Sequence, residues 1–360
     1  MTDTRSLFPG RSSVLLALSL LLVMAGCATH PKTKPQPAFY PAPPDEPRIQ
    51  YLTGFSSEDE LFGNSGFKNF ILGPDRTFKP IGKPYGVTSS PGRWYVCDTV
   101  ASTIAIMNLD RKSMHYLKTS GQGNLGVPIT SAVDALGNLY VADSSREQVL
   151  MYSADETYLG AIGKKDEMKP SGVAIAGGLL YVSDLKNHAV RVYQLGNHEL
   201  VRTIPSEGQG EKGKLYSPTN VAVDKQGRVY VSDTGGFCVQ VFDAEGHYVR
   251  TIGQQGLAPG QFARPKGIAV DKEGRVYVAD AATQVLQLFD SEGRLLMFFG
   301  DPGSTGPGAT SLPAGVAVDY DNVGYFGSFV APGRQIEYLI LVANQYGNPK
   351  ISVYGFLKQR

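Results

Sequence analysis

One block of sequence recurs six times, and this repetition constrains the fold more than any other feature of the chain. The segment Arg264–Asp280 aligns with Ser217–Asp233, and the two share the run Ala-Val-Asp-Lys-x-Gly-Arg-Val-Tyr-Val and a final Asp. A proline leads each copy, at intervals of 42 to 48 residues: Pro84, Pro128, Pro170, Pro218, Pro265 and Pro313. Self-similarity at such a period is typical of repeat architectures, in which each unit buries its faces against its neighbours.

Each copy predicts four short antiparallel strands. In the fifth copy, Gly267–Val270 and Val276–Ala279 are the first two strands, and the turn between them, Asp271–Gly274, ends on a glycine that can adopt a positive φ. The third and fourth strands, Val285–Phe289 and Leu295–Phe299, follow with a second turn of the same kind. Six such units predict an all-β fold, a six-bladed β-propeller.

The repeat also has a family resemblance. Residues 181–193 read Tyr-Val-Ser-Asp-Leu-Lys-Asn-His-Ala-Val-Arg-Val-Tyr, and Tyr140–Asp143 and Tyr277–Asp280 match the opening of this run. The pattern resembles the NHL repeat, whose Asn-His-Leu signature stands here as Asn187-His188-Ala189. The resemblance covers about residues 80–356. Because this repeat family includes binding and scaffold proteins as well as enzymes, the resemblance implies the fold and leaves the function open.

The two ends of the chain predict how the ring closes. The last copy lacks the expected Asp after its Tyr-Phe-Gly-Ser run, so we interpret Tyr320–Arg334 as an insertion. Leu339–Asn344 then becomes the second strand, with Asn344 in the place of the Asp, and Lys350–Gly355 becomes the third. The N-terminal segment Arg48–Phe55 is predicted to supply the missing fourth strand, so the propeller spans residues 48–360 and has no open sheet edge at the junction.

A short helix is expected between this closing strand and the first repeat. The sequence Ser57-Glu58-Asp59-Glu60 has the spacing of a capping box, in which a Ser at the N-cap and a Glu three residues later satisfy backbone N–H groups reciprocally.

The first 26 residues have the pattern of a targeting segment. Arg5 and Arg11 precede the apolar run Val14–Val23, and Met24-Ala25-Gly26 leads to Cys27. This resembles a bacterial lipoprotein signal peptide at residues 1–26. The alternative, a transmembrane anchor, needs about 20 apolar residues, and this run is shorter. The resemblance implies that Cys27 becomes the first residue of the mature protein and carries lipid, including palmitate, on its thiol and amino group.

The same resemblance implies a subcellular location for the protein. Ala28 rather than Asp follows the cysteine, which implies the outer membrane if the organism is Gram-negative, with the domain facing the periplasm or the exterior. Residues 27–47 are Pro-rich from His30 onward and are predicted to be a semi-rigid spacer. We therefore expect a lipid-anchored protein of the cell envelope.

Charge and cysteine content exclude several classes of protein. The chain has 34 basic and 33 acidic residues, so no bulk field attracts nucleic acid. Cys97 and Cys238 fall in the first and fourth copies, on nearly opposite sides of a six-membered ring, and are expected to be free, buried thiols. No Cys-x-x-Cys-His motif is present, so a covalently attached c-type haem is excluded. Nothing predicts a second subunit of the same chain, and we expect a monomer.

Candidate binding residues lie where inter-blade linkers and the loops between second and third strands converge on one face. This set is polar and mildly basic, which suits an anionic small molecule, a peptide or a partner protein: Tyr85, Thr130, Ser131, Arg146, Lys186, His188, Asn220, Arg264 and Lys266. Two series of aspartates are interpreted as structural. The first ends second strands and is expected to accept backbone N–H groups: Asp98, Asp143, Asp184, Asp233 and Asp280. The second begins tight turns: Asp134, Asp224, Asp271 and Asp319.

Two functional hypotheses remain. The first is a non-enzymatic binding or scaffold module for an envelope protein, with an electron-transfer assembly as one conceivable partner by analogy and the aromatic insertion Tyr325, Phe326 and Phe329 as a docking edge, unless these rings cap the core. The alternative is a metal-dependent lyase or lactonase at the channel mouth, with Asn220 among the ligands. The five histidines do not converge on one zinc site, and no metal or other cofactor is predicted. A calcium or zinc ion in the channel stays open.

Overall fold

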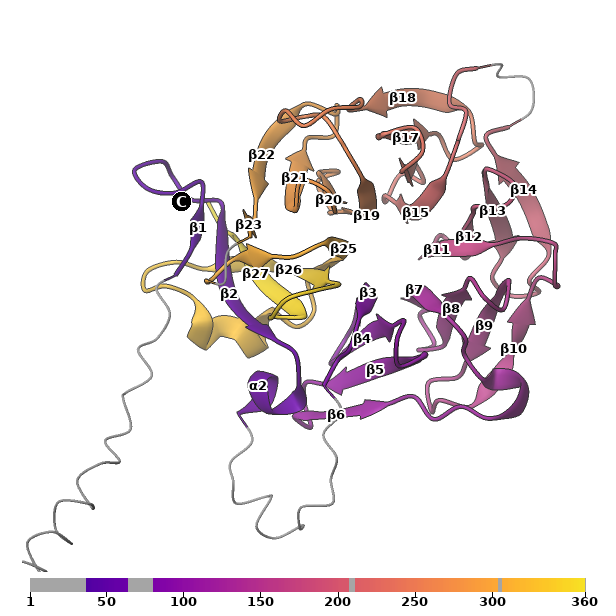
Figure 1. Cartoon of the computed structure of the whole chain (residues 1–360), viewed down its shortest axis with the longest axis horizontal. Coiled ribbons are helices and arrows are strands. Elements are labelled where there is room, and N and C mark those ends of the chain that lie inside the picture. Colours follow the sequence, from indigo (N-terminus) through magenta and orange to yellow (C-terminus); the bar gives the residue numbers. More distant parts are fainter. Residues whose placement is uncertain (1–36, 64–79, 207–210, 304–305, 360) are drawn as a thin grey trace, which may run out of the picture. The chain divides into compact units, whose positions relative to one another are not determined.

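Six antiparallel sheets succeed one another along the chain and surround a central axis (Figure 1). The structure is a computed structural model that describes residues 37–63, 80–206, 211–303 and 306–359. Blades 1 to 5 each contain four strands in chain order, and the first repeat strand of every blade lies nearest the axis (Figure 1). The predicted all-β, six-bladed propeller is therefore confirmed.

The strands of the first five blades agree closely with the repeat. Blade 1 contains β3 (Pro84–Ser90), β4 (Arg93–Asp98), β5 (Thr103–Asn108) and β6 (Ser113–Tyr116). Blade 2 contains β7 (Pro128–Val133), β8 (Leu139–Asp143), β9 (Gln148–Tyr152) and β10 (Tyr158–Ile162). Blade 3 contains β11 (Pro170–Ala176), β12 (Leu179–Asp184), β13 (Ala189–Gln194) and β14 (Leu200–Ile204). Blade 4 contains β15 (Pro218–Val223), β16 (Val229–Asp233), β17 (Cys238–Phe242) and β18 (Tyr248–Ile252). Blade 5 contains β19 (Pro265–Val270), β20 (Val276–Asp280), β21 (Val285–Phe289) and β22 (Leu295–Phe299).

Blade 6 is built from both ends of the chain. Its strands are β25 (Pro313–Asp319), β26 (Ile336–Asn344), β27 (Ile351–Leu357) and β2 (Ile49–Phe55), in that order from the axis. β2 pairs antiparallel with β27, with Ile49 opposite Phe356 and Phe55 opposite Ile351. The predicted closing strand is confirmed. A further short strand, β1 (Phe39–Tyr40), pairs with β2 inside the residues predicted as spacer. The parallel pair β23 (Asp301–Pro302) and β24 (Ala309–Thr310) lies between blades 5 and 6 in the chain.

The predicted helix is present as α2 (Glu58–Phe62). Ser57 is its N-cap and accepts the backbone N–H of Glu60, while the Glu60 carboxylate accepts the backbone N–H of Ser56 at 2.6 Å. The Ser57 half of the predicted capping box is therefore present, whereas Glu60 binds the N–H of Ser56, one residue before the N-cap. Residues Gly121–Gly123 form a short 3-10 turn, η2, between blades 1 and 2.

The core consists of layers between neighbouring blades. Because successive side chains of a strand point to opposite faces, Val276 and Val278 of β20 pack toward blade 4, whereas Tyr277 and Ala279 pack toward blade 6. Both faces of a blade are covered, so the second strands begin with a run of apolar residues. This is why the second strands read Val-Tyr-Val or Leu-Tyr-Val rather than alternating with polar residues.

The insertion contributes one of its aromatic side chains to the core. Residues Val323–Phe329 form a 3-10 helix, η3, and Phe326 is fully buried. Its ring stacks on Trp94 of blade 1 with 5.3 Å between centroids, and the Trp94 indole N–H donates to the Asp319 carboxylate at 2.7 Å. Of the three aromatic residues considered as a docking edge, only Phe329 is exposed, at 40%. The alternative that these rings cap the core therefore holds for Phe326.

The remaining structural predictions concern cysteines and the N-terminal segment. Cys97 and Cys238 are free and buried, as expected. Residues 1–26, predicted as the signal peptide, and Cys27 lie outside the described residues, and so does the spacer before residue 37. In the part of the chain that the structure describes, no helix is both long and apolar enough to cross a membrane.

Candidate functional site

The predicted binding residues lie at the end of the propeller where each first strand begins. This end carries the inter-blade linkers and the loops between second and third strands, and it is termed the linker face. Its frame is set by the aspartates that end second strands. Asp143, for example, is fully buried and accepts backbone N–H groups of Gly126, Val127, Ser145 and Arg146 at 2.6 to 3.1 Å. Each aspartate thereby joins the linker before its blade to the loop after its strand.

The same role is filled in every blade. Asp98, Asp184, Asp233 and Asp280 are also fully buried and accept backbone N–H groups from both segments. In blade 6, Asn344 accepts the backbone N–H of Ser311 at 3.3 Å and donates its own amide to the Pro349 carbonyl at 3.1 Å. The structural interpretation of these aspartates is confirmed, as is the substitution of Asn344 for the sixth.

The turn-forming aspartates, on the opposite face, are confirmed as well. Asp224 accepts the backbone N–H groups of Gln226 and Arg228 at 2.9 Å. In blade 5, Asp271 also accepts the guanidinium of Arg275 at 2.6 Å and the hydroxyl of Tyr338 from blade 6 at 2.9 Å. These carboxylates hold turns and join blades.

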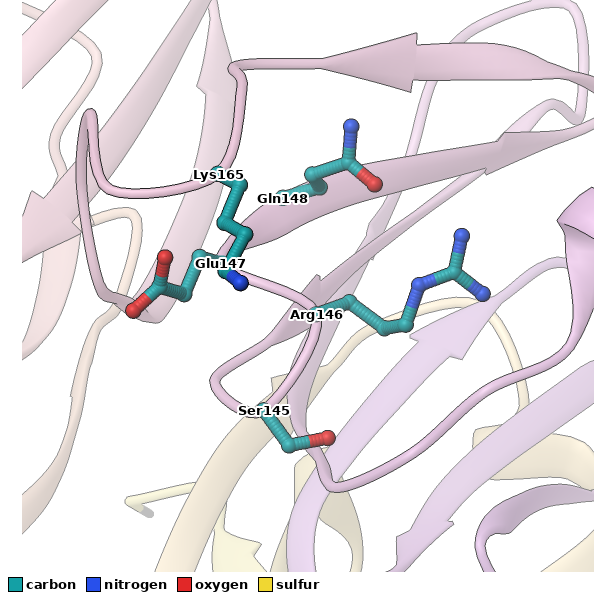
Figure 2. A pocket seen from close by; sticks show the side chains of 5 residues that line it. All are labelled: Ser145, Arg146, Glu147, Gln148 and Lys165. Carbon is teal, nitrogen blue, oxygen red and sulfur yellow. The ribbon is translucent and has the colours of Figure 1, made fainter.

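Arg146 and Lys186 lie on loops between second and third strands, where each side chain binds a neighbouring linker. The Arg146 guanidinium donates to the carbonyl of Gln122 at 3.0 Å and to that of Asn124. The Lys186 ammonium donates to the carbonyl of Asp166. Figure 2 shows Arg146 beside a cavity of about 380 Å³, on the loop between β8 and β9, with Lys165 on the neighbouring loop. Arg146 and Lys186, both predicted site residues, therefore hold loops in place.

His188 also makes a contact between blades. Its Nδ1 lies 2.6 Å from the carbonyl oxygen of Tyr216, which belongs to the linker before blade 4. The side chain is exposed, and the backbone has a φ of 52°. His188 thus bridges blades 3 and 4.

Thr130, Ser131 and Asn220 line the central channel, a cavity of about 260 Å³. The Thr130 hydroxyl donates to the carbonyl of Ser171 at 3.1 Å, and the Asn220 side-chain oxygen accepts the backbone N–H of Val221 at 2.8 Å. The rest of the lining comes from Gly, Ala, Val, Ile, Thr and Ser residues of the first strands. The channel is therefore lined by small side chains, and the Thr130 hydroxyl and the Asn220 side-chain oxygen are already engaged with backbone groups.

Glycines keep the inner strands close together. A Cβ on Gly315 would lie 2.4 Å from the carbonyl oxygen of Tyr85, and one on Gly267 would lie 2.7 Å from that of Ala314. Only glycine avoids a backbone clash at these positions.

Of the three remaining candidates, Tyr85 and Lys266 lie together at the mouth of the channel. The Lys266 ammonium sits over the Tyr85 ring, 4.8 Å from its centroid, and 3.5 Å from the side-chain oxygen of Gln345. Tyr85 belongs to blade 1 and Lys266 to blade 5, so the lysine side chain spans blade 6, where the corresponding residue is the small, buried Ala314. This contact is a cation–π interaction.

Further residues complete a group around this contact. The Lys83 ammonium lies 5.1 Å from the centroid of the Tyr346 ring, which is 50% exposed, and Arg264 is exposed beside Lys266. Burial and the positive charges of Arg264 and Lys83 lower the pKa of Lys266 to about 8. Burial also raises the pKa of Tyr85 to about 12, so its ring is neutral at neutral pH. The mouth cluster is defined as Lys83, Tyr85, Arg264, Lys266, Gln345 and Tyr346.

Half of the mouth cluster was predicted from the sequence. Tyr85, Arg264 and Lys266 were expected on this face, whereas Lys83, Gln345 and Tyr346 were not among the candidates. A signal for the last two existed, because they directly follow Asn344 and so begin the loop between the second and third strands of blade 6.

No metal centre is evident in the described ranges. Within them, no group of three or more His, Cys, Asp or Glu side chains is placed to hold a metal ion. The side-chain oxygen of Asn220, the ligand considered from the sequence, is already used by a backbone N–H.

Comparisons with known proteins agree with the architecture. Residues 168–193 match the family described as NHL repeat, and residues 210–297 match the family described as 6-bladed beta-propeller. The chain therefore carries NHL repeats in a six-bladed β-propeller, as the sequence pattern predicts. None of the curated proteins matches it.

Solved structures with the same architecture include proteins of different functions. A structural genomics protein of unknown function from Bacteroides thetaiotaomicron has a TM-score of 0.60 and 16% identity, over 86% of this chain and 76% of that one. A gluconolactonase from Xanthomonas campestris has a TM-score of 0.55 and 14% identity, over 91% and 96%. Virginiamycin B lyase from Staphylococcus aureus, with quinupristin, has a TM-score of 0.53 and 12% identity, over 76% and 95%. At these identities the likeness concerns the fold alone.

Proposed function

We propose that this chain is a lipid-anchored protein of the bacterial cell envelope whose propeller binds a partner protein without catalysing a reaction. One observation carries this proposal. The aspartates that end second strands at the linker face are buried and accept backbone N–H groups, whereas the mouth cluster presents the exposed Arg264 and Tyr346 to solvent. Groups of the second kind recognise a ligand, and nothing about them requires a chemical step.

The anchor is the second part of the proposal. The signal-like segment before Cys27 supports lipid attachment at that thiol, and the Pro-rich residues after it support a spacer between the lipid and the propeller. In a Gram-negative organism, Ala28 after the cysteine favours the outer membrane. An envelope partner is proposed because the anchor keeps the propeller near other envelope proteins and raises their effective concentration.

Lipidation can be tested on the full-length chain in cells grown with an alkyne analogue of palmitate. Labelling of the wild type and loss of labelling in Cys27→Ala are expected. Cys97→Ala is the matched control and should keep the label, because Cys97 is fully buried within blade 1. Equal labelling of the wild type and Cys27→Ala would contradict the anchor.

Binding can be tested by chemical cross-linking in intact cells, followed by identification of the adducts. We expect one or a few reproducible envelope partners. The alternative, a metal-dependent lyase or lactonase, predicts a different result: near-stoichiometric calcium or zinc in protein purified without chelator. Such a metal content, together with no reproducible adduct, would overturn the binding proposal.

A further inference from the structure

The mouth cluster concentrates positive charge that its surroundings do not neutralise. Lys83, Arg264 and Lys266 come from blades 1 and 5, and no Asp or Glu oxygen of the described chain lies within 4.0 Å of their charged atoms. Some other cations of the propeller do have such partners. Arg228 and Arg275, for example, each lie 2.6 Å from an aspartate oxygen of their own turn.

Lys266 is the most constrained of the three cations. Only 5% of the residue is exposed, and its nearest polar partner is the neutral side chain of Gln345 at 3.5 Å. Removing an ammonium group from water without a counter-charge is unfavourable, and Arg264 and Lys83 add repulsion. The Tyr85 ring offsets only part of this cost, since a cation–π contact contributes about 0.5–2 kcal/mol. A bound anion would satisfy all three cations at once.

We infer that the mouth cluster binds a carboxylate of an acidic segment in the partner protein, with Lys266 at the base of the site and Arg264 and Lys83 at its rim. This inference deepens the proposed function and rests on it, because it names what the linker face recognises. The exposed Tyr346 ring beside Lys83 supplies an aromatic surface for the rest of the segment.

The placement of Lys266 favours a protruding side chain over a flat surface. An anionic bilayer can reach the exposed Arg264, but the 5% exposure of Lys266 excludes contact with a plane of headgroups. The chain also has nearly equal numbers of acidic and basic residues, so no net positive charge attracts a membrane or a nucleic acid. A protruding Glu or Asp side chain carries the negative charge that this site lacks.

The test is the binding of a fluorescent hexaglutamate peptide to the full-length chain in a neutral detergent, measured by anisotropy at low and at high ionic strength. We expect saturable binding that weakens with salt. Lys266→Met, which keeps the length of the side chain and removes the charge, should weaken binding about tenfold, the loss of one charged hydrogen bond. Lys225→Met is the matched control on the opposite face and should bind like the wild type, because Lys225 is exposed in the turn between β15 and β16.

Each other outcome overturns the inference. Absence of hexaglutamate binding, or equal binding by the wild type and Lys266→Met, would show that the cluster is not the site. Displacement of the peptide by inorganic phosphate at equal concentration would indicate a small-anion site. Binding of vesicles containing phosphatidylglycerol with the same dependence on Lys266 would indicate a membrane site. If any of these occurs while cross-linked envelope partners persist, the inference fails and the proposed function stands; if the cross-links are absent too, both fail.

Discussion

On the linker face, blades 2 and 3 and blades 5, 6 and 1 treat positive charge in different ways. In the first sector, Arg146 binds two linker carbonyls, and Arg191 lies 2.8 Å from the Asp184 carboxylate and 3.1 Å from that of Glu167. In the second sector, Lys266 has only the side-chain oxygen of Gln345 and the Tyr85 ring. The repeat therefore uses Arg146 and Arg191 to fix loops in the first sector, whereas Lys266 in the second sector has no acidic partner among the described residues.

The largest loss of stability is expected when the carboxylate that organises the first sector is removed. Asp184 accepts the backbone N–H groups of Lys169 and Lys186 at 2.9 and 3.0 Å, as well as the guanidinium of Arg191. Asp184→Ala should lower the free energy of unfolding by about 3–5 kcal/mol, because it leaves a partly buried cation and several N–H groups without their acceptor. Urea unfolding followed by circular dichroism measures this change.

A control for this prediction lies in the same sector. Asp166 is exposed and pairs with Lys186 only at 3.9 Å, so Asp166→Asn should change stability by less than about 0.5 kcal/mol. An Asp184→Ala variant as stable as Asp166→Asn would contradict the structural role of the buried aspartates.

The second sector depends on close packing of the first strands of blades 6 and 1. A Cβ on Gly315 would lie 2.4 Å from the Tyr85 carbonyl oxygen, so Gly315→Ala should cost about 1–3 kcal/mol through overpacking. It should also weaken hexaglutamate binding, because Tyr85 is displaced. Gly327→Ala is the control, since a Cβ there has no neighbour within 4 Å. Equal thermal midpoints for the two variants would show that the strands have room to separate.

The charge of Lys266 has a smaller effect, on the pH dependence of the free energy of unfolding. Its pKa falls from 10.5 to about 8 on folding, so between these values the unfolded chain holds a proton that the folded chain has lost. Stability therefore rises with pH in this window, and the contribution of Lys266 should increase by about 1 kcal/mol between pH 7 and pH 9.

The variant Lys266→Met isolates this contribution. Burial raises the pKa of Cys97 and Cys238 to about 12, which acts in the opposite direction, but both thiols are present in both proteins. The difference in unfolding free energy between wild type and variant should therefore change with pH in favour of the wild type. A difference that stays constant from pH 7 to pH 9 would mean that Lys266 is not desolvated.

The repeat made most of the fold predictable from sequence. Leading prolines, glycine-ended turns and strand-ending aspartates depend on contacts within one copy or between adjacent copies, and these recur six times. The closing strand was predictable because the last copy visibly lacks a fourth strand. By contrast, the burial of Phe326 depends on stacking against Trp94, more than 200 residues away, and no local pattern encodes it.

The mouth cluster was only partly predictable for a similar reason. Lys266 and Tyr85 come from blades 5 and 1, and the intervening blade has the small Ala314 at the corresponding position, so the contact involves three different copies at once. Arg146 and Lys186 were equally good candidates in the sequence. Only the positions of the neighbouring carbonyl groups show that these two side chains are engaged.

Photo-cross-linking in intact cells, from one position in each sector, tests directly whether the mouth cluster contacts an envelope partner. A benzophenone amino acid would replace Tyr346 in the mouth cluster or the exposed Lys165 between blades 2 and 3. We expect a discrete envelope-protein adduct from position 346 that is lost when Lys266→Met is added. No adduct of the same size is expected from position 165. The same adduct from both positions, or an adduct from 346 that is unaffected by Lys266→Met, would contradict such a contact.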